Sequence, residues 1–393
     1  MACVKEDREY VLNLYNRLPL SIDHGKGMYL YDEDGREYLD FYSGIAVNSL
    51  GHQHPRIMEA MKEQLASFTH LSNYFCAPSQ VKLARLLVQN SFAGKVFFAN
   101  SGTEANEAML KLARKYGQGI SVKKTRFVSL ERGFHGRTFG GMSLTGNDSY
   151  KVQFGPTMEG ITHIPLNDVD ALKKAVDENT CGIIFEIIQG EGGLKGVSEE
   201  FMEAVKETAR KFKALILVDE VQTGLMRTGK LFAHEYFDIT PDAMTLAKGL
   251  GGGLPIGAML VHERLENVLQ PGDHGSTFGG NPVAAAAGSA LMEVILPVDF
   301  RERVEARSRY LLTKLNYLKE KYPLIITDIR GRGLMIGLEV GAYAERIRND
   351  ALKMNLLLNV TGKTVLRLLP ALIVEEKDID LFGEVMDDVL SAM

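Results

Sequence analysis

The sequence predicts an α/β fold, in which a large domain around a mostly parallel sheet precedes a smaller α+β domain. The middle of the 393-residue chain alternates short apolar runs with longer stretches at helical spacing, which is typical of parallel strands covered by helices on both faces. After about residue 290 this alternation stops. We therefore expect an N-terminal arm at 1–45 that packs with the small domain, a large domain at 46–290 and a small domain at 291–393.

Each expected element rests on a local pattern. In the arm, two tyrosine-containing runs at 29–31 and 38–41 flank a turn at 32–35. In the large domain, apolar runs predict strands at 96–99, 126–130, 182–188 and 214–218. Helical spacing predicts helices at 105–116 and 199–212. In the small domain we expect a helix at 300–321 and strands at 325–329 and 334–340.

Polar or glycine-rich residues come soon after three of the predicted strands, at 100–103, 133–136 and 219–220. Ligands of open α/β sheets bind outside the carboxyl ends of the strands. These three segments are therefore where we expect the chemistry of the protein.

Composition narrows the class of protein. The net charge of -5 and pI near 6.0 argue against a nucleic-acid partner. Three cysteines in no paired or metal-type spacing fit a reducing cytoplasm, and the charged N-terminus lacks the apolar core of a signal peptide. The weakly polar stretch at 282–298 carries Glu293 and follows the helix-capping residue Asn281, so we expect a buried helix and no membrane span.

Lys248 stands alone in an Ala-Lys-Gly-Leu-Gly-Gly-Gly segment. Most single lysines are simply solvated, but a lysine that forms a Schiff base needs apolar surroundings to lose its proton and open space for a flat ligand. The glycines offer that space.

Asp219 ends a strand-like apolar run, which is also how a magnesium-binding strand of an ATPase looks. That alternative needs a phosphate loop after an earlier strand. Near matches occur only at 224–230 and 362–364, both after Asp219, so an ATPase is disfavoured. A metal site is disfavoured as well, because His52, His54 and His262 lack further ligands at recognised spacing.

The segment 101–104 lies between a strand and a helix, where free N–H groups and the helix dipole bind anions. Together with Asp219, Lys248 and the loop residue Phe134, it supplies the parts that pyridoxal 5'-phosphate requires.

Eight motifs in order resemble the class III aminotransferases of fold type I, most closely their acetylornithine branch. They cover nearly the whole chain and lie at 50–55, 100–106, 133–138, 189–193, 219–224, 247–249, 276–282 and 367–370.

The resemblance implies roles for named residues. Lys248 would hold the aldehyde of pyridoxal phosphate and then move the substrate proton, and Asp219 would keep the ring nitrogen protonated. The cofactor contacts that the resemblance implies are Gly102, Thr103, Phe134, Asp219, Glu220, Val221, Gln222, Lys248 and Thr277. Because Thr277 would reach the neighbouring subunit's phosphate, a homodimer with shared active sites is implied.

The same resemblance implies the substrates. Arg137 would bind the carboxylate of N2-acetylornithine, with Ser276 reaching it from the partner subunit. Arg367 would bind the α-carboxylate of glutamate or 2-oxoglutarate. Glu191 would neutralise Arg367 when the substrate has no carboxylate there. The implied reaction moves the δ-amino group of acetylornithine to 2-oxoglutarate, a step of arginine biosynthesis.

Two positions depart from the family pattern: Ile187 replaces a proline and Met226 replaces a glycine. Met226 therefore occupies a position where positive φ is expected. The alternatives within the family act on succinylornithine, ornithine, 4-aminobutyrate or a carrier-bound lysine, and a binding protein or ATPase is the alternative from another class.

Overall fold

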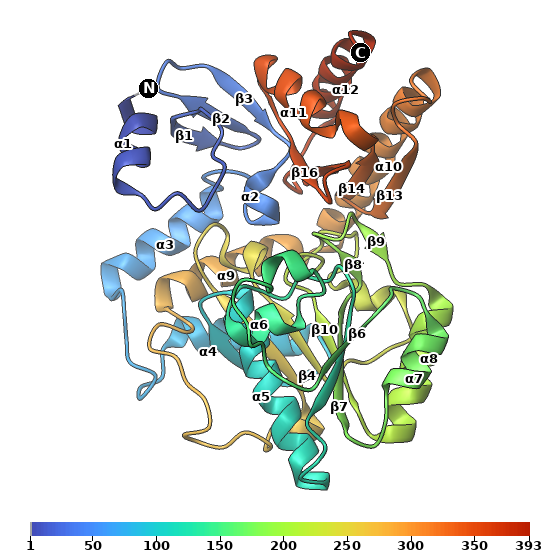
Figure 1. Cartoon of the computed structure of the whole chain (residues 1–393). Coiled ribbons are helices and arrows are strands. Elements are labelled where there is room, and N and C mark those ends of the chain that lie inside the picture. The colour runs from blue at the N-terminus through green and yellow to red at the C-terminus, as the bar shows by residue number, and fades with distance from the viewer. Residues whose placement is uncertain (1) are drawn as a thin grey trace.

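A computed structural model describes residues 2–393. Within this range the middle of the chain forms a seven-stranded sheet (Figure 1). Its order is β4 (Ala93–Ala99), β12 (Gly257–His262), β11 (Ala243–Leu246), β10 (Leu215–Asp219), β7 (Thr180–Glu186), β5 (Arg126–Leu130) and β6 (Ile161–Ile164). Only β12 runs antiparallel to its neighbours. The predicted α/β class and mostly parallel sheet are confirmed, although β6, β11 and β12 were not predicted.

Helices cover both faces of this sheet. Neighbouring residues of β7 point to opposite faces: Ile183 packs in one cluster with residues of α8 (Glu199–Phe212), and Ile184 packs in another with residues of α5 (Gly102–Ile120). Both helices begin at serine caps, because the hydroxyls of Ser101 and Ser198 accept N–H bonds from the first turn. The other α-helices between residues 55 and 295 are α3 (Pro55–Ser67), α4 (Pro78–Gln89), α6 (Phe139–Leu144), α7 (Val169–Ala175) and α9 (Pro282–Ile295).

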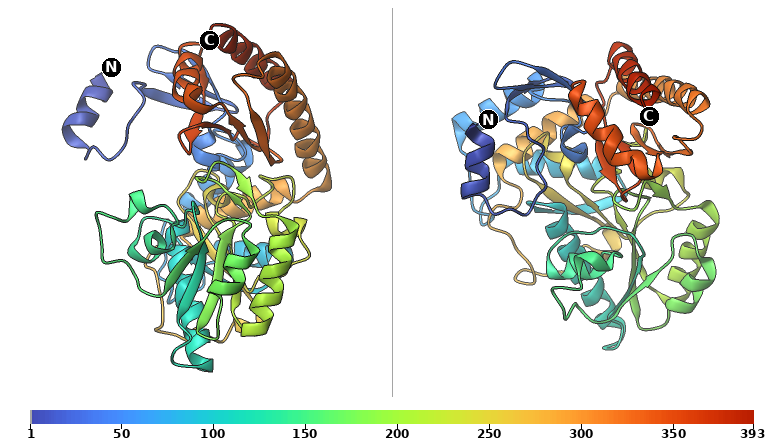
Figure 2. Two further views of the ribbon diagram at one scale, coloured as in Figure 1. Left: turned by 45° about the vertical axis from the view of Figure 1, so that its right-hand side comes forward. Right: turned by 45° about the horizontal axis from the view of Figure 1, so that its top comes forward.

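The N-terminal arm and the C-terminal segment lie together at one end of the molecule (Figures 1 and 2). Strands β1 (Ile22–Lys26), β2 (Tyr29–Asp32) and β3 (Glu37–Asp40) form a sheet that β15 (Leu356–Leu357) completes. The parallel pairing of Leu39 with Leu356 joins the arm to the C-terminal part. Helices α1 (Ala2–Tyr10) and α2 (Ser43–Ala46) flank these arm strands in the sequence.

The C-terminal segment also has its own antiparallel sheet, in the order β13 (Asp328–Arg332), β14 (Met335–Glu339), β17 (Val365–Leu368) and β16 (Asn359–Thr361). Helices α10 (Val298–Lys321), α11 (Ala344–Lys353) and α12 (Glu376–Ser391) accompany it. The segment 325–329 was predicted as a strand, but its first residues lie outside the sheet. Ile326 is fully buried, and the strand starts at Asp328.

Among the described residues, no single helix has the length and apolar character to cross a membrane, and only α9 and α10 together, bent by 76°, meet that test.

Candidate active site

A cavity of about 520 Å³ opens at the carboxyl ends of β4, β5, β7 and β10. Its walls come from the segments that follow those strands and from the turn η3 (Lys248–Gly251). The predicted residues on its lining are Gly102, Thr103, Phe134, Arg137, Glu191, Asp219, Val221, Gln222 and Lys248. The fold thus gathers residues that lie up to 146 positions apart, from Gly102 to Lys248.

Asp219 sits at the end of β10 with only 3% of its surface exposed. One carboxylate oxygen accepts from His135 Nδ1 and Asn106 Nδ2, both at 2.8 Å, and the other accepts from the Val221 N–H at 3.0 Å. Burial lowers the pKa of the His135 imidazole, but the hydrogen bond and charge of Asp219 outweigh it and raise that pKa overall. Asp219 is therefore a fixed acceptor whose second oxygen has a lone pair left for a ligand.

Glu186, at the end of β7, ties two loops of the cavity together. Its two oxygens accept from the Phe134 N–H at 3.0 Å and the Gly190 N–H at 3.1 Å. Burial raises the pKa of this carboxyl well above its ordinary value, His135 opposes the shift, and Asp219 adds to it. The Glu186 side chain therefore holds both the loop that carries Phe134 and the loop that carries Glu191.

Lys248 lines the cavity, and its Nζ donates no hydrogen bond to any residue that the structure describes. Burial, followed by the charge of Arg367, lowers its pKa to about 8. An amine with this pKa is partly neutral near pH 7 and is available as a nucleophile.

The N-terminus of α5 forms an anion cradle. The first N–H groups of a helix have no partner inside the helix, and the Ser101 hydroxyl satisfies the Glu104 N–H at 3.3 Å, leaving those of Gly102 and Thr103 for a ligand. A side chain at Gly102 would lie 2.8 Å from Val221, so glycine lets these two segments approach. The Thr103 hydroxyl also faces the cradle, where it bonds Thr138 at 2.8 Å.

Arg367 is almost fully buried at the edge of the cavity. Its Nη1 donates to Glu191 Oε1 at 2.7 Å, to the Gly190 carbonyl at 2.9 Å and to Gln222 Oε1 at 3.2 Å. On its opposite edge, Nε and Nη2 both donate to Asn359 Oδ1, at 2.9 and 2.6 Å. Asn359 is the direct cross-strand partner of Arg367 in β16 and β17, so the strand register fixes the guanidinium from behind.

Arg137 lies at the open side of the cavity. Its guanidinium carbon lies 4.0 Å from the centre of the Tyr150 ring and 5.8 Å from the centre of the Phe134 ring. No carboxylate in residues 2–393 lies within ion-pair distance of it. Besides Lys248, the cavity lining therefore includes one cation without an anionic partner, Arg137, while Arg367 lies behind the lining and is neutralised by Glu191.

The sequence matches the family model for class III aminotransferases over residues 10–390. The chain is 46% identical over 387 residues to an acetylornithine aminotransferase of Caldanaerobacter subterraneus subsp. tengcongensis, covering 98% of each chain. The chain belongs to the class III aminotransferases.

Other relatives extend the comparison. An acetylornithine aminotransferase of Methanocaldococcus jannaschii is 42% identical, with 98% of this chain and 97% of that one covered. Among solved structures, acetylornithine aminotransferase from Elizabethkingia anophelis superimposes with a TM-score of 0.90 at 31% identity, covering 100% and 99% of the two chains. An ornithine aminotransferase from Toxoplasma gondii that contains pyridoxal phosphate superimposes with a TM-score of 0.93 at 31% identity, covering 99% and 94%.

This class III aminotransferase depends on pyridoxal phosphate, as its family does. The cavity fits that cofactor in three respects. The α5 cradle suits a phosphate, Asp219 offers an acceptor for a protonated ring nitrogen, and Lys248 offers an amine for the aldehyde.

Four predicted residues of the aminotransferase do not line this cavity: Glu220, Ser276, Thr277 and Arg367. Arg367 nevertheless meets the lining through Glu191 and Gln222. The Glu220 carboxylate instead binds the His234 N–H at 2.8 Å and His234 Nδ1 at 2.9 Å. Consecutive residues at a strand end face opposite ways, so Asp219 faces the cavity and Glu220 faces away.

Ser276 and Thr277 line a separate cavity of about 780 Å³ on the same subunit. Ser276 Oγ accepts from Asn100 Nδ2 at 3.1 Å, and Asn100 lines the catalytic cavity, so the two cavities adjoin at this contact.

Sequence reasoning missed His135, Asn106, Glu186 and Asn359. His135 and Asn106 stand within the motifs at 133–138 and 100–106, and Glu186 stands near the end of the predicted strand at 182–188, so a search for polar residues in these segments could have found them. For Asn359 the sequence carries no such signal, because only the pairing of β16 with β17 brings it to Arg367.

The two departures from the family pattern lie outside the catalytic cavity. Ile187 is buried, and its carbonyl accepts the Val197 N–H at 3.0 Å. Met226 has a φ of 69°, as expected from the glycine of the family pattern, and the residue is 3% exposed. Neither residue contributes to the lining.

Proposed function

We propose that this enzyme transfers the δ-amino group of N2-acetyl-L-ornithine to 2-oxoglutarate, giving N-acetyl-L-glutamate 5-semialdehyde and L-glutamate in arginine biosynthesis. The observation that carries the proposal is a pair of arginines at one cavity: Arg137 in its lining without an anionic partner, and Arg367 behind the lining, neutralised by Glu191. The names of the relatives at 42–46% identity support the same activity.

The two arginines let one cavity serve two dissimilar substrates. Acetylornithine presents its δ-amine at the end of an uncharged methylene chain, which suits an Arg367 that stays paired with Glu191. Its carboxylate then pairs with Arg137 at the open side. For 2-oxoglutarate, Glu191 withdraws and Arg367 binds the α-carboxylate through its planar fork.

Bound pyridoxal phosphate supplies an aldehyde that captures the amine and a ring that accepts electrons when the substrate C–H bond breaks. Gly102 and Thr103 would bind its phosphate at the α5 terminus, Phe134 would stack on the ring and Gln222 would bond the ring hydroxyl. Val221 packs beside Gly102, and Glu220 acts indirectly by holding the segment after β10.

Two groups carry the proton chemistry. Asp219, fixed by His135 and Asn106, keeps a proton on the ring nitrogen. Lys248 Nζ would hold the aldehyde of the bound cofactor and, once free of it, would be the base that moves the proton from the substrate carbon.

We propose that the active form is a homodimer. Large apolar side chains stand exposed beside the cavity that Ser276 and Thr277 line: Tyr74 at 96%, Phe75 at 66% and Phe278 at 58%. Exposed aromatic groups of this kind mark protein interfaces. In the dimer, Thr277 reaches the partner's phosphate and Ser276 the partner's substrate.

We also propose a cytoplasmic location, since Cys3, Cys76 and Cys181 are all unpaired.

A panel of amines with 2-oxoglutarate tests the proposed substrate. Initial rates are compared for acetylornithine, succinylornithine, ornithine and 4-aminobutyrate. We expect the highest kcat/KM with acetylornithine, and Arg137→Ala should lose most of the preference over ornithine. Negligible turnover of acetylornithine beside fast turnover of another amine would overturn the assignment.

A further inference from the structure

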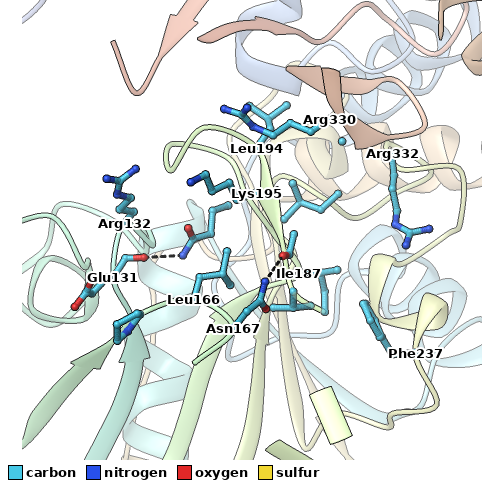
Figure 3. Close-up of a pocket in the computed structure, with 16 residues that line it drawn as sticks. Glu131, Arg132, Leu166, Asn167, Ile187, Leu194, Lys195, Phe237, Arg330 and Arg332 are labelled. Carbon is cyan, nitrogen blue, oxygen red and sulfur yellow. Dashed lines mark hydrogen bonds between the residues drawn. The ribbon is translucent and has the colours of Figure 1, made fainter. Parts of the chain in front are cut away.

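A second cavity, of about 570 Å³, lies outside the catalytic site (Figure 3). Its walls come from the segments after β5 and β6, from the hairpin of β8 (Ile188–Gln189) and β9 (Lys195–Gly196), and from the end of β13. None of the predicted cofactor or substrate residues lines it. Because it joins the large domain to the C-terminal sheet, a ligand bound there contacts both.

The cavity has an excess of positive charge. Four basic side chains line it, and of these only Arg330 is neutralised, by Asp328 and Glu339 at 2.8 Å each. Within residues 2–393, Arg132, Lys195 and Arg332 have no carboxylate at ion-pair distance.

The acidic groups around this cavity do not cancel that charge. Glu131 is its one acidic lining residue, and Figure 3 shows the Glu131 carboxylate pointing away from Lys195 and Arg332. Uncompensated cations around a concave surface attract anions.

The floor of the cavity is apolar. Ile187 and Ile188 are buried beneath it, and Leu166 and Phe237 are partly buried beside them. Polar groups in the wall are already satisfied: Asn167 bonds the Gly196 carbonyl at 3.2 Å and the Ser198 N–H at 2.8 Å. An apolar floor with a cationic rim suits an amphipathic anion rather than a bare ion.

The cavity is connected to the catalytic site by one short hairpin. The turn between β8 and β9 carries Glu191, which neutralises Arg367 on the catalytic side. Lys195 lies at the end of the same turn on the other side, and Arg330 donates to the Gly193 carbonyl at 2.5 Å. A ligand that fixes Lys195 therefore restricts the segment that must move when Glu191 leaves Arg367.

We propose that this cavity binds a small organic carboxylate with an apolar tail and thereby modulates the exchange between the two substrates. The carboxylate pairs with Lys195, the charges of Arg132 and Arg332 on either side of the cavity add to the attraction, and the tail covers the apolar floor. The modulation, though not the binding, rests on the proposed role of Glu191 and Arg367 in handling 2-oxoglutarate.

Calorimetry on the holoenzyme with 4-phenylbutyrate tests the binding, with the neutral 4-phenylbutanamide as the matched ligand. We expect 4-phenylbutyrate to bind and the amide to bind at least tenfold more weakly. The variant Lys195→Gln/Arg332→Gln should raise the Kd of the carboxylate at least tenfold. The control Lys173→Gln/Lys174→Gln removes the same charge from an exposed part of α7 and should leave the Kd unchanged.

Equal affinity in the wild type and the Lys195→Gln/Arg332→Gln variant would place the probe elsewhere, the catalytic cavity included, and would overturn the site. Equal affinity for the acid and the amide would do the same. For the modulation, we expect saturating 4-phenylbutyrate to change the KM for 2-oxoglutarate at least threefold in the wild type but not in the variant. A KM unaffected by bound probe would refute it. Failure of the enzyme to use acetylornithine would leave the calorimetric result standing.

Discussion

Replacing Asn359 by alanine tests the hydrogen bonds that hold Arg367 on the side away from the substrate. Asn359 Oδ1 accepts from Nε and Nη2 of Arg367, and no other acceptor among the described residues meets these two atoms. The variant leaves the guanidinium in place but frees it to rotate. We therefore expect it to weaken the binding of a carboxylate and to spare the substrate that leaves Arg367 paired with Glu191.

The size of the effect follows from the two hydrogen bonds. Each hydrogen bond to a charged group contributes about 1.5–3 kcal/mol. Since one oxygen accepts both bonds, the pair together contributes about 2–3 kcal/mol to holding the guanidinium in place. At 1.4 kcal/mol for each tenfold change, this is roughly a 30- to 150-fold fall in kcat/KM for 2-oxoglutarate. For acetylornithine we expect a change of less than about threefold, because Glu191 still anchors Nη1.

The assay measures the two half-reactions separately by the absorbance of the cofactor. Asn349→Ala is the matched control, because Asn349 also accepts from the Nε and Nη2 of an arginine, Arg348, but on an exposed surface. Thermal denaturation of both variants checks that they fold. An equal loss in both half-reactions, or no loss with 2-oxoglutarate, would refute the role of Asn359.

Three further predictions address the cofactor, the backbone and the dimer. Only the neutral amine of Lys248 attacks an aldehyde, and the pKa of this amine is about 8. The rate at which the cofactor-free enzyme binds pyridoxal phosphate should therefore rise about tenfold from pH 7 to 9 and then level off. A rate still rising steeply above pH 10 would contradict this. At Met226, glycine relieves about 1 kcal/mol of left-handed backbone strain but loses a buried side chain worth about 2–5 kcal/mol. Met226→Gly should therefore lower the free energy of unfolding in urea, whereas Lys213→Gly, at the left-handed cap of α8, should raise it by about 0.5–1 kcal/mol; the opposite order would show that strain dominates. Mixing Lys248→Ala and Thr277→Ala homodimers under exchange conditions should create one intact site per mixed dimer and raise activity above the sum of the two, and no gain would place Thr277 in its own subunit's site.

The sequence predicted what depends on local motifs. Lys248, Asp219 and the 101–104 loop are each recognisable from neighbouring residues, and the structure brings them into one cavity. The positive φ of Met226 was also predictable, because the family pattern has glycine there.

Features that depend on long-range pairing were not predicted. Strand β12 runs antiparallel between β4 and β11, and nothing within its own residues specifies that direction. Its neighbour β11 is four residues long, too short for a periodicity to stand out. His135 gains its importance only from Asp219, 84 residues away, and Asn359 only from the β16–β17 register.

The attachment of pyridoxal phosphate to Lys248 is the central claim, and reduction with sodium borohydride tests it most directly. Borohydride fixes the cofactor to whichever amine holds it, and peptide mass mapping then identifies that residue. We predict one modified peptide, with the cofactor on Lys248, and none when reduction follows full conversion of the enzyme by glutamate. Modification of a different lysine, or no modified peptide from holoenzyme with its absorbance band intact, would contradict the account.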